Sequence, residues 1–208
     1  MALEATHIRF ALDLKDKYKV SDIRKYVSGT VYPDSRYVSE IDRHLTHPED
    51  FMDEGFIKND DFRKGWAIHL LCDKIQAEIT RDKLPEIFEL ETGQGSPRWI
   101  YHTALKILQD IDDVQKFDIK KYLPFLDYVE TPNGEDLKIV LKYNQIFQNM
   151  YKDPVRTNID SCYEMWKLFG IGDELATKVK LQAEVYSKDK RIMDFIGQIY
   201  NLMLERAR

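Results

Sequence analysis

Apolar residues recur at helical spacing along most of the chain. In residues 61–82, the side chains of Trp66, Leu70, Ile75 and Ile79 form a broad apolar face, which predicts a long helix. The sequence contains no alternating apolar and polar run bounded by hairpin turns, the pattern typical of strands. We therefore expect an all-α fold, a multi-helix bundle with short connections between antiparallel neighbours.

Capping and helix-breaking residues set the expected boundaries. Thr6 is a candidate cap for a first helix over 6–18, and Gly29 is expected to end the second helix. Ser96 can cap a helix that has Pro97 at its first position. The remaining helices are expected over 21–29, 61–82, 97–117, 119–128, 135–151, 159–169, 172–187 and 188–206.

Length and composition indicate one folded domain over residues 1–208, with candidate chemistry in 6–73 and a helical remainder over 96–208. The net charge of −5 argues against a general nucleic-acid-binding protein, which usually presents a basic face. An enzyme for a small phosphorylated substrate remains compatible with this charge, because a metal ion can supply local positive charge. No heptad pattern persists over several turns, so the sequence predicts no oligomeric state.

The cysteine content and the lengths of the apolar runs indicate the cellular compartment in which the protein is expected. Cys72 and Cys162 imply no disulfide framework, which is typical of a reducing compartment. The first residues lack the basic start and apolar core of a secretory signal, and no run reaches the length of a membrane span. A cytoplasmic location is expected.

His69 and Asp73 are the first candidates for chemistry. They are four residues apart on the long predicted helix, so their side chains project from the same side, one turn apart. Imidazole nitrogen and carboxylate oxygen both suit zinc, iron or manganese. The pair alone is also explained by a histidine at the core boundary beside a surface aspartate. Its apolar setting favours the metal interpretation, because buried polar groups need partners.

Other segments of the first third supply further candidate ligands. His7 lies on the first predicted helix, and Asp34 follows a turn whose Pro33 can direct the carboxylate inward. His44 and His47 lie three residues apart in Arg-His-Leu-Thr-His, just before a proline.

In this order, the motifs resemble the zinc-dependent phospholipase C-like proteins, which are related at a distance to S1/P1-type nucleases. The resemblance covers residues 6–73 and rests on His7, Gly-Thr-Val-Tyr-Pro-Asp34, Arg-x-x-Thr-His47 and Gly-Trp-x-x-His69-x-x-x-Asp73. It implies a helical fold like that of these enzymes. It also implies a zinc-activated water that attacks a phosphodiester.

The resemblance also implies roles for individual residues. Asp34, His47, His69 and Asp73 would surround one metal ion, and Asp73 would bridge to a second ion held also by His7. Asp34, His69 and Asp73 would be the catalytic set. Secreted members of the family add the free amino end of the chain and a later His-x-x-x-Glu as ligands. Here six residues precede His7 and no such motif follows Asp73, so one or two ions are expected.

Three more residues are candidates with alternative interpretations. His102 is either a ligand or general acid/base, or a histidine hydrogen-bonded to a neighbour. His44 is either exposed or a substitute for His47. Arg43 can pair with Asp34, hold a substrate phosphate, or form a surface ion pair. We also expect the acidic run Asp110-Ile111-Asp112-Asp113 to be a solvated face.

Together these features predict a metal-dependent hydrolase of phosphoesters, with phosphodiesters preferred. The metal would be zinc, with iron or manganese as alternatives. One alternative is a phosphohydrolase of the HD type, but the chain has no adjacent His-Asp pair. Another is a non-catalytic helical scaffold that retains a degenerate metal site. The residues do not identify the phosphorylated substrate.

Overall fold

Helices make up the regular structure of residues 4–58 and 60–208, which are the residues that the computed structural model describes. No strand occurs within these ranges, so the expected all-α class is confirmed. The α-helices are α1 (Glu4–Leu14), α2 (Ile23–Val31), α3 (Arg36–Ser39), α4 (Arg43–Thr46), α5 (Glu54–Ile57), α6 (Asp61–Lys83), α7 (Pro85–Phe88), α8 (Pro97–Lys116), α9 (Leu137–Tyr151), α10 (Ile159–Leu168), α11 (Asp173–Tyr186) and α12 (Lys190–Ala207). Short 3₁₀ turns are η1 (Tyr32–Ser35), η2 (Ile119–Lys121), η3 (Leu123–Asp127) and η4 (Pro154–Arg156).

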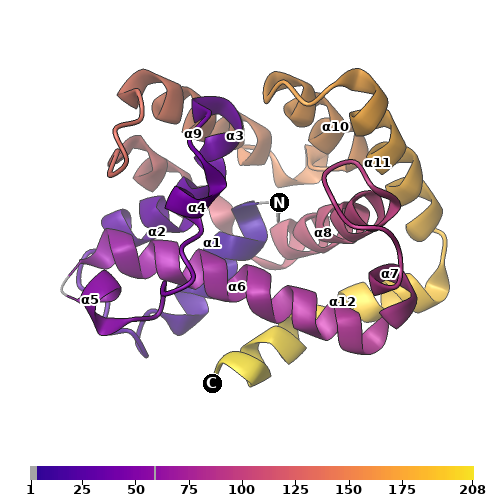
Figure 1. Cartoon of the computed structure of the whole chain (residues 1–208), viewed down its shortest axis with the longest axis horizontal. Coiled ribbons are helices and arrows are strands. Elements are labelled where there is room, and N and C mark those ends of the chain that lie inside the picture. Colours follow the sequence, from indigo (N-terminus) through magenta and orange to yellow (C-terminus); the bar gives the residue numbers. More distant parts are fainter. Residues whose placement is uncertain (1–3, 59) are drawn as a thin grey trace.

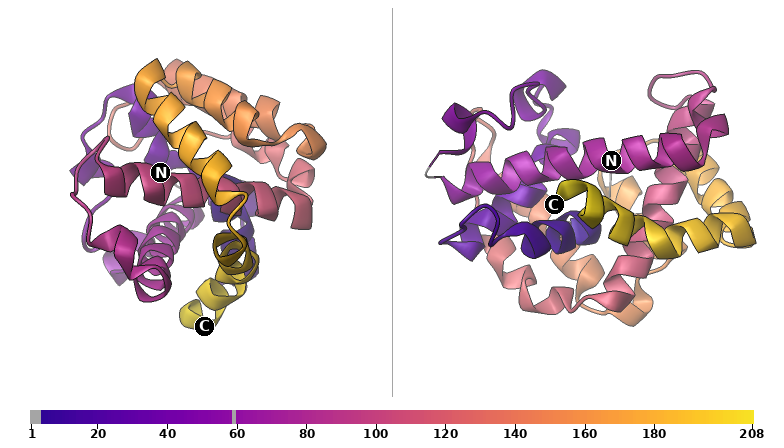
Figure 2. Two further views of the ribbon diagram at one scale, coloured as in Figure 1. Left: turned by 90° about the vertical axis from the view of Figure 1, so that its right-hand side faces the viewer. Right: turned by 90° about the horizontal axis from the view of Figure 1, so that it is seen from below.

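The long helix α6 spans the molecule and organises its neighbours (Figure 1). Helix α2 packs across its first half, α12 runs beside it on the lower face, and α1 lies between α6 and α8 (Figure 2). Helices α9, α10 and α11 cover the other side of α1 and α8. Three apolar clusters result among the described residues. One lies between α1, α8, α9, α10 and α11, one between α1, α6 and α12, and a smaller one consists of Tyr32, Phe62, Trp66 and Leu70.

Helices α2 and α6 touch through their backbones. A Cβ atom added at Gly29 would lie 1.9 Å from the Phe62 carbonyl oxygen, and one at Gly65 would lie 2.0 Å from the Tyr26 carbonyl oxygen. Only glycine permits this separation. The prediction that Gly29 ends the second helix is therefore wrong: the helix continues to Val31, and the glycine is a contact residue.

Several predicted boundaries are confirmed within a few residues, including the cap of α8, where the Ser96 hydroxyl accepts from the Trp99 amide. Two others differ. The first helix already includes Glu4, so Thr6 does not cap this helix. The Thr6 hydroxyl instead donates to Asp113 at 2.7 Å. Segment 119–128 forms two 3₁₀ turns, because Pro124 lacks the amide that an α-helix would need.

None of the helices in the described ranges combines the length and the apolar character that crossing a bilayer would require.

Candidate metal centre

His69 and Asp73 lie one turn apart on the side of α6 that faces α1 and α8. The His69 ring is fully buried, whereas the Asp73 side chain is 21% exposed. The Nε2 atom of His69 lies 3.9 Å from Asp73 Oδ2. This turn of α6 therefore carries one buried nitrogen ligand and one carboxylate that reaches solvent.

The orientation of the His69 ring is set by helix α2. Its Nδ1 lies 2.8 Å from the Thr30 carbonyl oxygen, which can only accept, so Nδ1 carries the proton. The Nε2 lone pair is then free, and this buried atom has no hydrogen-bond partner in the part of the chain that the structure describes. A hydrogen bond from one ring nitrogen to a carbonyl typically orients a metal-binding histidine.

Asp34 and His47 approach His69 from the segment after α2. Asp34 lies in η1, where Pro33 interrupts the α-helical hydrogen bonding, and its buried Oδ2 has no partner in the described part of the chain. His47 follows α4, which is attached to α6 by a 2.6 Å hydrogen bond from Trp66 Nε1 to the Thr46 carbonyl. One ligand atom each from Asp34, His47 and His69 lies within 4.8 Å of the other two.

His7 lies beneath this group, on α1. Its ring stacks on that of His69 with centroids 3.7 Å apart, and neither ring nitrogen has a hydrogen-bond partner within residues 4–58 and 60–208. Glu4, one turn earlier, forms a second group with His7 and His69. Glu4 Oε1 accepts from the Tyr143 hydroxyl at 2.6 Å, and no described residue bonds to its buried Oε2.

Burial keeps the histidines neutral. It lowers the pKa of His7 and of His69, and it lowers the pKa of His47 to about 3. Burial likewise raises the pKa of Glu4 well above its usual range, with the nearby Asp34 carboxylate adding to the effect. Neutral imidazoles are the form that binds metal, and unpartnered buried nitrogen and oxygen atoms are the donor set that zinc, iron and manganese take. The residues therefore fit a divalent metal ion.

Asp73 is held by a cation from another helix. Lys106 Nζ on α8 lies 2.7 Å from Asp73 Oδ1, and the lysine is only 6% exposed. Burial alone would raise the pKa of the Asp73 carboxyl, but interactions with positive charge, first of all the Lys106 ammonium, outweigh it. The pKa consequently lies well below its usual range.

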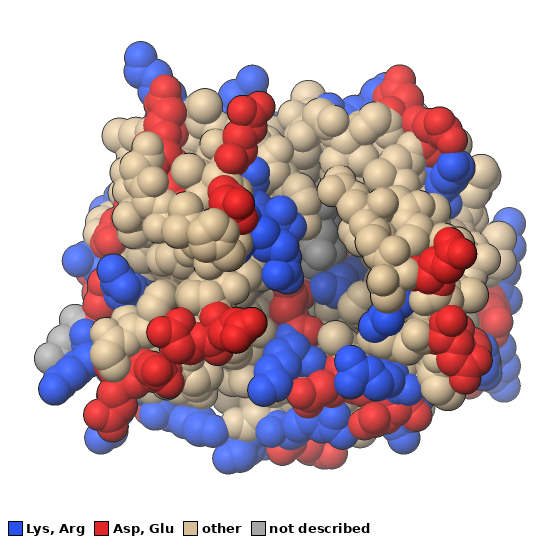
Figure 3. All heavy atoms as spheres, in the orientation of Figure 1, with Lys and Arg blue, Asp and Glu red and all other residues tan. Residues whose placement is uncertain are grey.

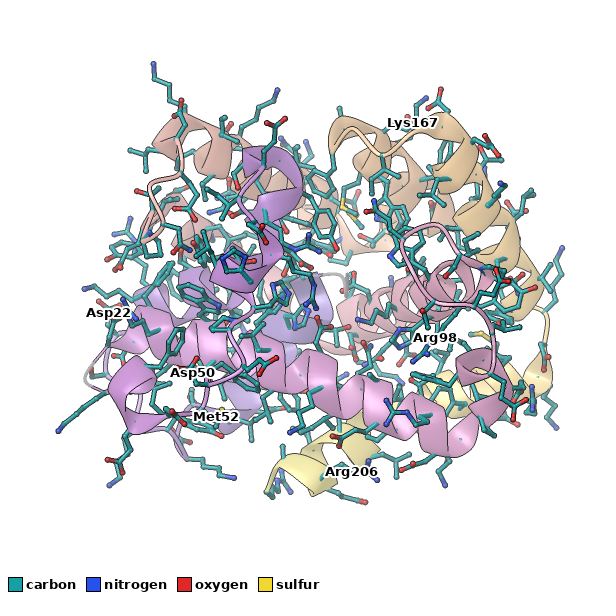
Figure 4. The ribbon with its side chains drawn as sticks, in the orientation of Figure 1. Asp22, Asp50, Met52, Arg98, Lys167 and Arg206 are labelled. Carbon is teal, nitrogen blue, oxygen red and sulfur yellow. The ribbon has the colours of Figure 1, made fainter. Side chains whose placement is uncertain are left out.

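A cleft of about 480 Å³ opens above these residues. Asp34, His47 and Asp73 line it, together with residues of the glycine-containing loop 92–96. Positive side chains dominate its described lining, with Arg36, Arg43, Arg98 and Lys106 against the two carboxylates. Figure 3 shows this hollow near the centre of the face, with Lys and Arg at its rim, and Figure 4 shows Arg98 beside it, on α8.

The other sequence candidates occupy different positions. His102 lines the cleft one turn before Lys106, with an unpartnered Nε2, and burial lowers its pKa well below the usual value. Arg43 lines the cleft too, without an ion pair to Asp34 among the described residues. His44 is not brought to the site: its side chain is 73% exposed and its Nδ1 lies 2.8 Å from Asp42.

Sequence reasoning overlooked Glu4 and Lys106. Both had a signal in the sequence, since Glu4 lies three residues before His7 and Lys106 four residues after His102, spacings that place each pair on one helix face. The partnership between Lys106 and Asp73 had no such signal, because it joins residues 33 positions apart.

The acidic run on α8 corrects another expectation. Asp110 and Asp113 are fully buried rather than solvated. Asp110 accepts from the Thr6 amide at 3.0 Å and from the Tyr151 hydroxyl at 2.8 Å, and Asp113 pairs with Arg9 at 2.6 Å. Burial raises the pKa of Asp110 to about 7 and that of Asp113 to about 6.

The substitution Asp110→Asn is expected to stabilise the metal-free protein at pH 8 by about 2–4 kcal/mol. Below about pH 4 the carboxyl is neutral in both states, so wild type and variant should have similar free energies of unfolding. Between about pH 4 and about pH 7 the unfolded state loses its proton while the folded state keeps it, so wild type alone is destabilised. Urea unfolding across this range measures the difference.

Asp112→Asn is the matched control, since Asp112 pairs with Lys116 at the surface. Parallel pH profiles for wild type and Asp110→Asn would contradict the assignment of a protonated Asp110.

Comparisons of the chain with protein-family models, with curated proteins and with solved structures found no match. Fold and site therefore define a class only: an all-helical protein with a candidate metal centre of histidine and carboxylate side chains, open to a cationic cleft.

Proposed function

We propose that this protein is a metal-dependent phosphoester hydrolase that prefers phosphodiesters. One observation carries the proposal: Asp34, His47 and His69 converge beside a cleft whose described lining includes four cations, and two of their buried ligand atoms lack partners among the described residues. Unpaired buried polar atoms are costly, so their retention at one point favours a ligand there. The order of motifs that resembles the zinc-dependent phospholipase C-like proteins supports the same function, together with the related helical fold.

In the proposed site, Asp34, His47 and His69 hold the ion, preferably zinc. A divalent ion at this position would lower the pKa of a water molecule and polarise a phosphoryl oxygen. The protein's own contribution is to orient the ligands, through the bond from His69 to the Thr30 carbonyl and the contact between Thr46 and His47. Asp73 is ionised at neutral pH and lies 3.9 Å from both His7 and His69.

The cleft walls suit a negatively charged substrate. Arg43 on α4 and Arg98 on α8 both line the cleft, and guanidinium groups bind phosphate oxygens in a bidentate manner. Trp99 and Tyr37 supply aromatic surface next to these cations. We propose that the arginines bind the phosphate and the aromatic side chains contact the remainder of a small substrate.

Removal of metal is expected to abolish hydrolysis of bis(p-nitrophenyl) phosphate. Protein purified without an affinity tag should contain zinc, iron or manganese, and chelation should lower the rate by roughly 100-fold or more. Zinc or manganese should then restore it. Parallel assays with p-nitrophenyl phosphate test the preference for diesters.

Hydrolysis at the full rate after complete removal of metal would refute a metal-dependent mechanism. Absence of metal from the purified protein, without uptake on addition, would favour the alternative of a helical scaffold.

A further inference from the structure

Lys106 is an unusual residue to find beside a metal centre. It is almost fully buried on α8, and among the described residues its ammonium donates to Asp73 Oδ1 at 2.7 Å. Burying a lysine is costly unless its charge is balanced, so this ion pair is a defined part of the site.

The carboxylate that Lys106 holds lies close to two histidines of the candidate ligand groups. Asp73 Oδ2 lies 3.9 Å from His69 Nε2, and Oδ1 lies 3.9 Å from His7 Nε2. Asp73 belongs to neither ligand group, and its Oδ1, the oxygen that faces His7, is already bonded to Lys106. An ion at Glu4 and His7 could therefore take this oxygen as a further ligand only in place of the lysine.

The two ligand groups also compete for His69. Each includes this histidine, yet only its Nε2 lone pair is free, because Nδ1 donates to the Thr30 carbonyl. Once an ion at Asp34 and His47 takes Nε2, a second ion depends on Glu4, His7 and Asp73. A second divalent charge would then lie next to the Lys106 ammonium, in surroundings where like charges repel strongly.

We propose that Lys106 takes the place of a second metal ion, so that the native protein holds one ion at Asp34, His47 and His69. The fixed ammonium neutralises Asp73 and presents positive charge to the cleft, which it also lines. This inference rests on the proposed metal site and specifies its stoichiometry.

The test is zinc stoichiometry and affinity in the full chain, measured by elemental analysis after equilibration in zinc buffer and by titration against a chromophoric chelator. Lys106→Met keeps the length and apolar stem of the side chain and removes the charge, and Lys106→Gln is a second neutral variant. Lys106→Arg retains the charge as the matched control. The double variant Lys106→Met, His7→Ala removes a ligand of the second position.

Wild type and Lys106→Arg are expected to bind one equivalent, and the neutral variants two. The second equivalent should bind roughly 100-fold or more tightly in the neutral variants than in wild type, because a like charge has been removed from its vicinity. The double variant should return to one equivalent. Far-ultraviolet circular dichroism monitors folding throughout.

Two results would overturn the inference and leave the proposed function intact: two equivalents of similar affinity in wild type, or one equivalent in a folded neutral variant. The wild-type titration is decisive even where a variant does not fold. Wild type that binds no zinc would instead refute the proposed metal site itself.

Discussion

Replacement of His69 by alanine is expected to remove the bound metal and to lower phosphodiester hydrolysis by on the order of 1,000-fold. His69 is common to both candidate ligand groups, and its unpartnered Nε2 faces them. Loss of a residue that merely orients a ligand typically costs 10–100-fold in metal affinity, so loss of a ligand itself should cost more. Elemental analysis and initial rates, measured on the same preparations, test the expectation.

The variant needs controls, because alanine also leaves a cavity and deprives the Thr30 carbonyl of its donor. His69→Gln retains an amide that can donate to this carbonyl while providing a much poorer metal ligand. His44→Ala is the matched histidine control, since His44 is exposed and outside the site. Full metal content and activity in folded His69→Gln would exclude His69 as a ligand.

Replacement of Gly65 by alanine should destabilise the protein by about 3 kcal/mol or more. The added methyl group would lie 2.0 Å from the Tyr26 carbonyl oxygen and 2.8 Å from the Thr30 amide nitrogen. These are backbone atoms that no change of rotamer can move, so α2 and α6 must separate. The separation would lengthen the hydrogen bond between Thr30 and His69, so metal affinity should fall together with stability.

Gly197→Ala provides the control. Gly197 is an exposed glycine within α12, and an added Cβ atom there has nothing within 4 Å. This change should be neutral or stabilising by about 0.5–1 kcal/mol, because alanine favours helix. Urea unfolding of both variants gives the comparison, and equal stabilities for Gly65→Ala and wild type would contradict the close contact of α2 and α6.

Local sequence was sufficient for the long helices α6 and α8 and for placing His69 and Asp73 one turn apart. Helical periodicity and the Ser96-Pro97 start depend on residues within a few positions of one another, so α6 and α8 were predicted within one or two residues. The i, i+4 spacing follows from the pitch of the helix alone. The expectation that His7, Asp34 and His47 join this pair came from the resemblance in their order along the chain.

Glycine and acidic residues were misinterpreted where their meaning depends on distant segments. Glycine is a residue type that often ends a helix, yet Gly29 lies where the backbones of α2 and α6 touch. An acidic run is typical of a solvent-exposed helix face, yet Asp110 and Asp113 are buried and accept hydrogen bonds from α1. In both cases the local preference is weak compared with the free energy of packing, which involves partners more than 30 residues away.

By itself, the sequence determined an all-helical chain, most of its helix boundaries and one pair of candidate ligands on α6, because each depends on short-range periodicity. Only the tertiary structure decided that Glu4 lies with His7 and His69, that Lys106 holds Asp73, and that His44 stays outside. The physical reason is that a residue's burial and charge partners are set by how helices from distant parts of the chain pack together. Helical periodicity does not specify that packing.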